Sequence, residues 1–147
     1  MKRFVMPVAI AVAIVCLSTW LVAQGAEKYT ARLGWVPISG AERANVTGKG
    51  SASATLAGRK LTITGSFEGL AAAATDARLH EGVARGARGS AIVDLTITKA
   101  TSGTISGSID LTAAQVSALR EGRLYIQVHS EKGVAPDGAN LWGWFLK

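Results

Sequence analysis

The sequence predicts an all-β domain, either an antiparallel β-sandwich or a partly open barrel of about seven or eight strands, with one short helix. Two observations predict this fold. Apolar and polar residues alternate with a period of two in several runs, which is typical of strands with one buried face. Short turn sequences such as Ala57-Gly58-Arg59 separate the runs, and short turns favour antiparallel hairpins over crossover connections.

The strands follow from this alternation. It is clearest over 60–68, 91–98, 104–111 and 123–130. Weaker strand candidates cover 29–35, 50–56, 77–81 and 141–146. In the run over 91–98, the period places Ala91, Val93 and Leu95 on one face, which we expect to line the core.

One helix is predicted over about 112–121. Thr112 and Gln115 have the spacing of a capping box, and Gly122 is placed to end the helix. Leu119 is expected to point toward the core. The helix therefore connects two strands rather than covering a whole sheet.

Residues 1–26 are predicted to be an export signal, and residues 27–147 the folded domain. Lys2 and Arg3 precede an uncharged apolar run over 4–23, which ends in small residues suited to cleavage. The run is also long enough to cross a bilayer, so an uncleaved anchor is the alternative. We expect a periplasmic or secreted protein that touches a membrane only through this segment if it is not cleaved.

Composition narrows the class of protein further. The chain has 147 residues and a formal net charge of +6, which becomes +4 without Lys2 and Arg3. The only cysteine, Cys16, lies in the export segment, so the domain has neither a disulfide nor a thiolate metal site. There is no basic stripe with interleaved aromatic residues, so nucleic acid is not an expected partner. No nucleophile elbow or other catalytic motif is present, and a non-enzymatic protein is expected.

The two histidines are candidate metal ligands. Alternation puts His80 beside Arg78, and His129 beside Tyr125, on the polar faces of their strands. Neutral imidazole is a good ligand for zinc or copper. A periplasmic metal-binding protein or redox auxiliary that uses His80 and His129 is therefore the alternative function. The other interpretation is that no cofactor binds and that each ring hydrogen-bonds to loop backbone.

Aromatic residues near the C-terminus are candidate contact residues. Trp142 and Trp144 share one face of the last predicted strand, and Tyr125 is expected on the same side. Exposed tryptophan suits stacking on a sugar or packing against a protein, so an envelope protein or a glycan is the expected partner. Arg78, in a basic segment, is a further contact candidate. In the alternative interpretation, the helix or the N-terminal segment with Trp35 covers the tryptophans in a second small core.

Three stretches of the sequence carry spaced motifs. The first is Ala77-Arg78-Leu79-His80-Glu81-Gly82 followed by Ala91-Ile92-Val93-Asp94-Leu95, and the second is Ser106-Gly107 followed by Leu111-Thr112 and Gln115. The third is Tyr125-Ile126-Gln127-Val128-His129-Ser130 followed by Pro136-Asp137-Gly138 and Leu141-Trp142-Gly143. Together they resemble the CHRD domain, which is named after chordin and is also common in exported bacterial proteins. The resemblance covers roughly residues 28–147. It implies a β-sandwich-like domain of an exported binding or structural module, in a family without a settled biochemical activity.

The sequence departs from this family pattern at three single positions and in the family's N-terminal element, which is reduced here to Val36-Pro37. Arg78 stands where the family usually has the first histidine of a pair. Trp142 and Trp144 occupy positions that are commonly arginine and glutamine. The tryptophan pair is therefore a feature of this chain beyond the resemblance.

Overall fold

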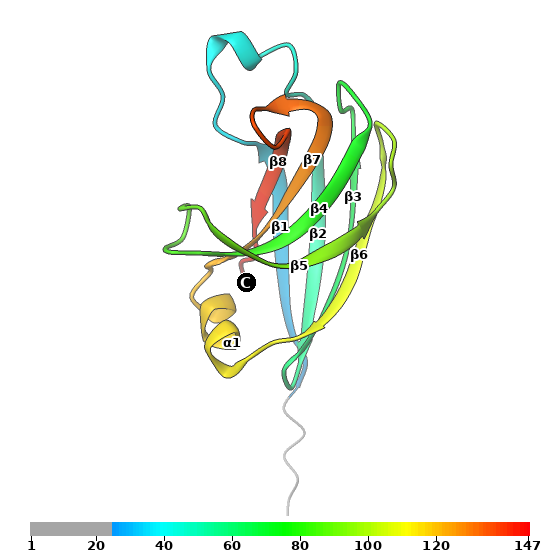
Figure 1. The fold of residues 1–147 in the computed structure, drawn as a ribbon. Coiled ribbons are helices and arrows are strands. Elements are labelled where there is room, and N and C mark those ends of the chain that lie inside the picture. Colours follow the sequence, from blue (N-terminus) through cyan, green and yellow to red (C-terminus); the bar gives the residue numbers. More distant parts are fainter. Residues whose placement is uncertain (1–24) are drawn as a thin grey trace, which may run out of the picture.

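The computed structural model describes residues 25–147, and the predicted export segment lies outside these residues except for its last two positions. Eight antiparallel strands close into a barrel in the order β1-β2-β3-β6-β5-β4-β7-β8 (Figure 1). The strands are β1 (Glu27–Trp35), β2 (Lys49–Ala57), β3 (Lys60–Glu68), β4 (Ala74–Gly82), β5 (Gly89–Ile97), β6 (Gly103–Asp110), β7 (Leu124–Val134) and β8 (Ala139–Trp144). A single turn of 3-10 helix (Gly40–Glu42) and the helix α1 (Ala113–Arg120) complete the fold. No helix within residues 25–147 is long and apolar enough to cross a membrane.

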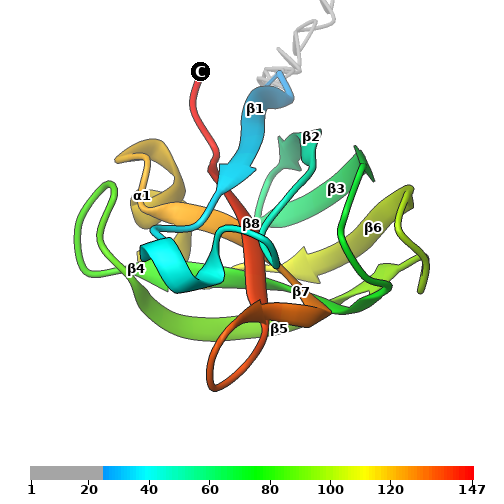
Figure 2. The ribbon, with the colours of Figure 1, turned by 90° about the horizontal axis from the view of Figure 1, so that it is seen from above.

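Two short pairings close the barrel. β5 and β6 pair only through Thr96–Ser106 and Ile97–Ile105. β1 pairs with β2 as far as Leu33 and then with β8 at Gly34 and Trp35. The wall therefore consists of two four-stranded halves, β1-β2-β3-β6 and β5-β4-β7-β8, joined at their corners (Figure 2). This confirms the predicted all-β class and shows that the barrel is closed.

The core fills the inside of the barrel as the alternation predicts. Leu61, Ile63 and Phe67 of β3 are buried, as are Leu124 and Ile126 of β7. Each buried aliphatic or aromatic side chain of this size contributes about 1.5–3 kcal/mol to folding. Burial of this kind stabilises a domain whose residues 27–147 include no cysteine.

The predicted helix is also confirmed. The Thr112 hydroxyl accepts a 3.2 Å hydrogen bond from the Gln115 backbone N–H, and the Thr112 N–H donates to Gln115 Oε1 at 2.9 Å. Gly122 follows the helix with a φ of +72°, which favours glycine. Val116 and Leu119 join the core from α1.

The face assignment of β5 is wrong at its start. Val93 lies opposite Leu79, but His80 lies opposite Ala91, so Ile92 is an extra residue in a β-bulge. Because a bulge shifts the alternation by one position, Ala91 is exposed rather than directed into the core. The sequence period alone does not show such an insertion.

β7 departs most from expectation, because its outward side chains are buried as well as its inward ones. Tyr125, Gln127 and His129 are 1%, 3% and 1% exposed. The Gly89 N–H donates to the Tyr125 hydroxyl at 3.2 Å, and Asp137 Oδ2 lies 3.4 Å from His129 Nε2. The β4–β5 loop and the β7–β8 connection therefore cover the outer face of this strand.

The first residue of β1 ties three parts of the fold together. The Glu27 carboxylate lies 2.6 Å from Arg120 Nη2 at the end of α1 and 2.8 Å from Nζ of Lys147. It also accepts a 2.7 Å hydrogen bond from the Tyr29 hydroxyl. The hydrogen bond from Arg120, followed by those from Lys147 and Tyr29, lowers the pKa of Glu27 from 4.5 to about 2.

This lowered pKa predicts how stability depends on pH. The carboxylate contributes stability above its ordinary pKa of 4.5, and that contribution is lost as the pH falls toward about 2. At pH 7 we expect Glu27→Gln to lower the free energy of unfolding by on the order of 1 kcal/mol, because the cluster is partly solvated. Urea unfolding followed by circular dichroism measures the difference. Glu68→Gln, which breaks the exposed pair with Lys49, is the control with little effect. An equal loss in both variants, or a Glu27→Gln effect that persists unchanged at pH 2, contradicts the prediction.

Candidate functional site

The predicted contact residues come together on the outer face of the half that contains β4, β7 and β8. One cross-strand row runs from His80 through Tyr125 to Trp144. In this row the rings of His80 and Tyr125 stack with centroids 4.9 Å apart, and those of Tyr125 and Trp144 are 4.3 Å apart. Trp142 completes the cluster, with its ring centroid 5.9 Å from that of Trp144.

The members of this cluster differ in accessibility. Tyr125 is 1% exposed, so the expectation that it offers contact surface beside the tryptophans is corrected. Its ring instead supports Trp144 from below. Trp142 and Trp144 are partly exposed. We call these two residues the tryptophan patch.

The β4–β5 loop covers one side of the tryptophan patch. The Arg88 guanidinium lies 5.6 Å from the centre of the Trp142 ring, a cation–π distance. At Gly82, an added Cβ would lie 2.8 Å from Trp144 Cη2 and 2.4 Å from the Ala87 carbonyl oxygen. Only glycine therefore allows the loop to approach the ring this closely.

The other side of the patch is open. Gly34 of β1 lies opposite Trp142 in the register, and no atom lies within 4 Å of where its Cβ would be. The cover on the patch is the β4–β5 loop, not the helix. Trp35 is 47% exposed and donates its indole N–H to the Gly48 carbonyl at 2.9 Å. The expected cover by the helix or by the N-terminal segment with Trp35 is therefore not what the structure shows, because the β4–β5 loop covers one side of the patch instead.

Arg78 lies in the next cross-strand row, opposite Gln127. Its Nε is 3.1 Å from Asp94 Oδ1 and 3.2 Å from Asp76 Oδ1. The guanidinium is shared between two carboxylates of this chain, which compete with any acidic partner. In the structure Arg78 joins β4 to β5 beside the patch, and a contact role for it stays a prediction.

The two histidines occupy separate environments. His80 Nδ1 lies 3.2 Å from the Gly89 carbonyl oxygen, and burial lowers the pKa of His80 below its ordinary value, which keeps the ring neutral. His129 Nδ1 lies 2.8 Å from Asp76 Oδ1, and its Nε2 lies 2.8 Å from the Gln127 amide nitrogen. Each ring therefore has one hydrogen-bond contact, through Nδ1 of His80 and Nε2 of His129, while His80 Nε2 and His129 Nδ1 form no hydrogen bond with the described residues.

The register also separates the histidines along the sheet. His80 lies opposite Tyr125, whereas His129 lies opposite Asp76, and the Arg78–Gln127 pair stands between them. Four positions of β7 correspond to about 13 Å of strand. Within residues 25–147, no group of three histidine, cysteine or acidic residues is arranged to hold a metal ion. The structure therefore does not bring the two histidines together in one metal site.

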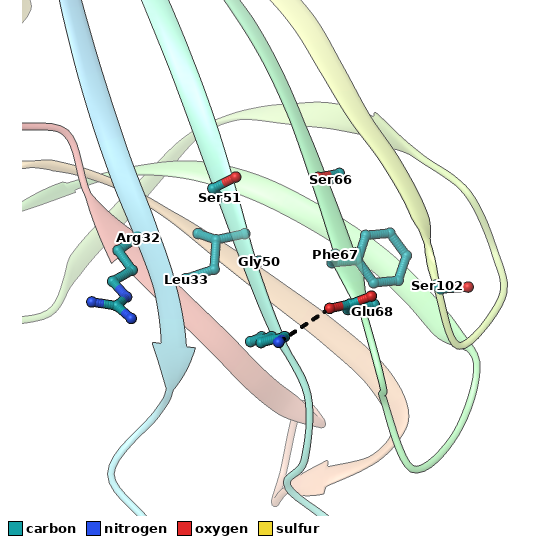
Figure 3. A pocket seen from close by; sticks show the side chains of 9 residues that line it. Arg32, Leu33, Gly50, Ser51, Ser66, Phe67, Glu68 and Ser102 are labelled. Carbon is teal, nitrogen blue, oxygen red and sulfur yellow. Dashed lines mark ion pairs between the residues drawn. The ribbon is translucent and has the colours of Figure 1, made fainter.

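A pocket that the sequence reasoning missed lies on the other half of the barrel. It has a volume of about 540 Å³ and is lined from β1, β2 and β3 and by the β5–β6 connection (Figure 3). Its residues include Arg32, Ser51, Ser66 and Ser102, with Phe67 as an apolar part of the lining. The alternating strands carry the signal for it in their polar positions, but a period of two shows only that these positions face away from the core.

Comparison with known proteins gives one match. The family model of the CHRD domain matches residues 36–139. No curated protein and no solved structure matches the chain. The match spans the tryptophan-supporting strands β4 and β7 and ends at the start of β8.

Two glycines next to the tryptophan patch provide a test of its cover. Gly82→Ala forces a methyl group against Trp144 and the Ala87 carbonyl, so we expect it to lower the free energy of unfolding by about 1–3 kcal/mol. Gly34→Ala adds the same methyl group in open space on the other side and is the matched control. Urea unfolding monitored by tryptophan fluorescence measures both variants. Equal stabilities would show that the loop does not pack on Trp144.

Proposed function

The chain belongs to the CHRD domain family, and from this premise we propose that it is an exported, non-enzymatic binding module. The proposed compartment is the periplasm or the exterior of the cell. The cationic start at Lys2 and Arg3, the apolar run over 4–23 and the small residues after it support export. The domain is proposed to act through its outer surface on an envelope protein or a glycan.

The tryptophan patch is the observation that carries this proposal. Trp142 and Trp144 stay partly exposed although Tyr125 beneath them is buried. Tyr125 and the β4–β5 loop hold the rings in place, so binding costs little side-chain entropy. Rigid, partly exposed aromatic residues are the side chains that contribute most to protein interfaces.

The polar groups around the patch support a binding role rather than catalysis. His129 is 1% exposed, and its two ring nitrogens face Asp76 and Gln127. His80 is almost as buried and lies against the Gly89 carbonyl. A general base has to reach the proton that it removes, and these rings are directed at the protein itself.

Affinity capture from the native envelope fraction tests the proposal. The full chain carries a tag, and the wild type is compared with Trp142→Ala, Trp144→Ala and the control Trp35→Ala. Trp35 is 47% exposed but lies outside the patch, so it controls for loss of an exposed tryptophan. We expect Trp142→Ala and Trp144→Ala to weaken capture of the partner about 30-fold, as the loss of a central aromatic contact does. Thermal unfolding checks that each variant is folded.

The outcomes of the capture experiment show whether the tryptophan patch contacts a partner or only stabilises the fold. Reduced capture by folded patch variants, with normal capture by Trp35→Ala, supports the proposal. Equal capture by all four proteins contradicts it. It is also contradicted if both patch variants unfold and acrylamide fails to quench the tryptophan fluorescence of the Trp35→Ala variant, because the rings of Trp142 and Trp144 are then only structural.

A further inference from the structure

The outer face of the half formed by β1, β2, β3 and β6 carries rows of hydroxyl groups. The register aligns Thr30, Ser53, Thr64, Ser106 and Thr96 across five successive strands. All five side chains are exposed. The row contains no charged and no apolar side chain, so it offers only neutral hydrogen-bonding groups.

A second row runs beside the first. Arg32 lies opposite Ser51, Ser51 opposite Ser66, and Ser66 opposite Thr104. Neighbouring strands are about 4.8 Å apart, and same-face positions along a strand are about 6.7 Å apart. The two rows therefore form a regular grid of hydroxyls, which we call the hydroxyl face.

The hydroxyl face is hollowed along its second row. The pocket of about 540 Å³ includes Arg32, Ser51 and Ser66 of that row (Figure 3). A second hollow of about 300 Å³ joins Ser51 and Ser66 to Ser53 and Thr64 of the first row. Gly65 lies between Thr64 and Ser66, and its missing Cβ would lie 2.7 Å from the Ser51 carbonyl oxygen. Volumes of this size are typical of small-ligand sites.

The hydroxyls in the hollow have no partner in the protein. Within residues 25–147, no hydrogen bond engages the side chains of Ser51, Ser53, Thr64 or Ser66. Three charged side chains line the larger pocket, and Lys49 Nζ lies 3.3 Å from Glu68 Oε1, which leaves Arg32 as one net positive charge. Neutral groups that both donate and accept match a ligand that is itself rich in hydroxyls. A strongly charged ligand would find too few counter-charges here.

We propose that the hydroxyl face binds a neutral oligosaccharide chain laid across β1, β2 and β3. The tryptophan patch adjoins it. In the register between β1 and the C-terminal end of the chain, Gly34 lies opposite Trp142 and Thr30 lies opposite Leu146. The same register places Trp144 level with Arg32 on β1. Arg32 separates this indole from Ser51, the first hydroxyl of the second row, so a chain laid across the strands can stack one sugar on Trp144 and hydrogen-bond the sugars that follow. This ligand class rests on the proposed function of the chain as a binding module. The residues that would bind the ligand are those of the hydroxyl face and not those of the tryptophan patch alone.

Isothermal titration of the full chain, purified from the envelope fraction, tests this inference. The probes are cellohexaose and chitohexaose as neutral chains and hexagalacturonic acid as a charged one. In the variant Ser51→Lys/Ser66→Lys, long side chains fill the hollow. The variant Thr62→Lys/Ser108→Lys carries the same new charge on exposed positions of the same sheet that line neither hollow and is the matched control.

We expect at least one neutral hexasaccharide to bind. Ser51→Lys/Ser66→Lys should weaken it about tenfold or more, because several hydrogen bonds are lost, while the control changes it by less than about twofold. The inference is overturned if neither neutral chain binds in the millimolar range, if both double variants lose binding equally, or if only hexagalacturonic acid binds. These results leave partner capture by the tryptophan patch unaffected, so failure of this inference is distinguishable from failure of the proposed function.

Discussion

Burial of both faces of β7 is the constraint on which the rest of this structure depends. Leu124 and Ile126 point into the core, while Gln127 and His129 point outward and are buried as well. Buried polar groups need partners, because an unsatisfied one costs about 1–3 kcal/mol. Asp76 Oδ1 on β4 lies 2.8 Å from His129 Nδ1, although the geometry makes no hydrogen bond between these two atoms, and the β7–β8 connection brings Asp137 Oδ2 to 3.4 Å from His129 Nε2. The segments next to β7 are thus constrained by packing on the inner face of the sheet and by packing on its outer face.

The division of the barrel into two halves follows from this constraint. The half around β7 uses the outer face of β7 for packing, and beside this buried strand Trp142 and Trp144 of β8 remain partly accessible. The half around β3 has no such cover, and many of its outward positions are exposed serine and threonine. Aromatic contact and neutral hydrogen bonding therefore lie on adjoining surfaces, which meet where β1 passes from β2 to β8. The two binding proposals assign one type of recognition to each surface.

Much of the fold could be predicted from the sequence, because strands with one buried face leave a clear period. β3 and α1 formed as their patterns indicate, down to the capping box at Thr112. The site was less predictable. The bulge at Ile92 shifts the faces of β5, and the cover over Tyr125 comes from a loop about 36 residues earlier in the chain. The alternation of apolar and polar residues within one strand does not show whether a distant segment of the chain covers its outer face. The pattern therefore predicts an exposed Tyr125.

Thiol labelling tests the burial of the outer face of β7 most directly. In a Cys16→Ser background, single cysteines replace Gln127 on β7, which is 3% exposed, and Ser53 on β2, which is exposed. Both side chains point outward, so only the cover distinguishes them. The account predicts that the cysteine at position 127 reacts at least about 100-fold more slowly in the native protein than the one at position 53, and equally fast in urea. Equal native rates would contradict the burial from which the rest of the account follows.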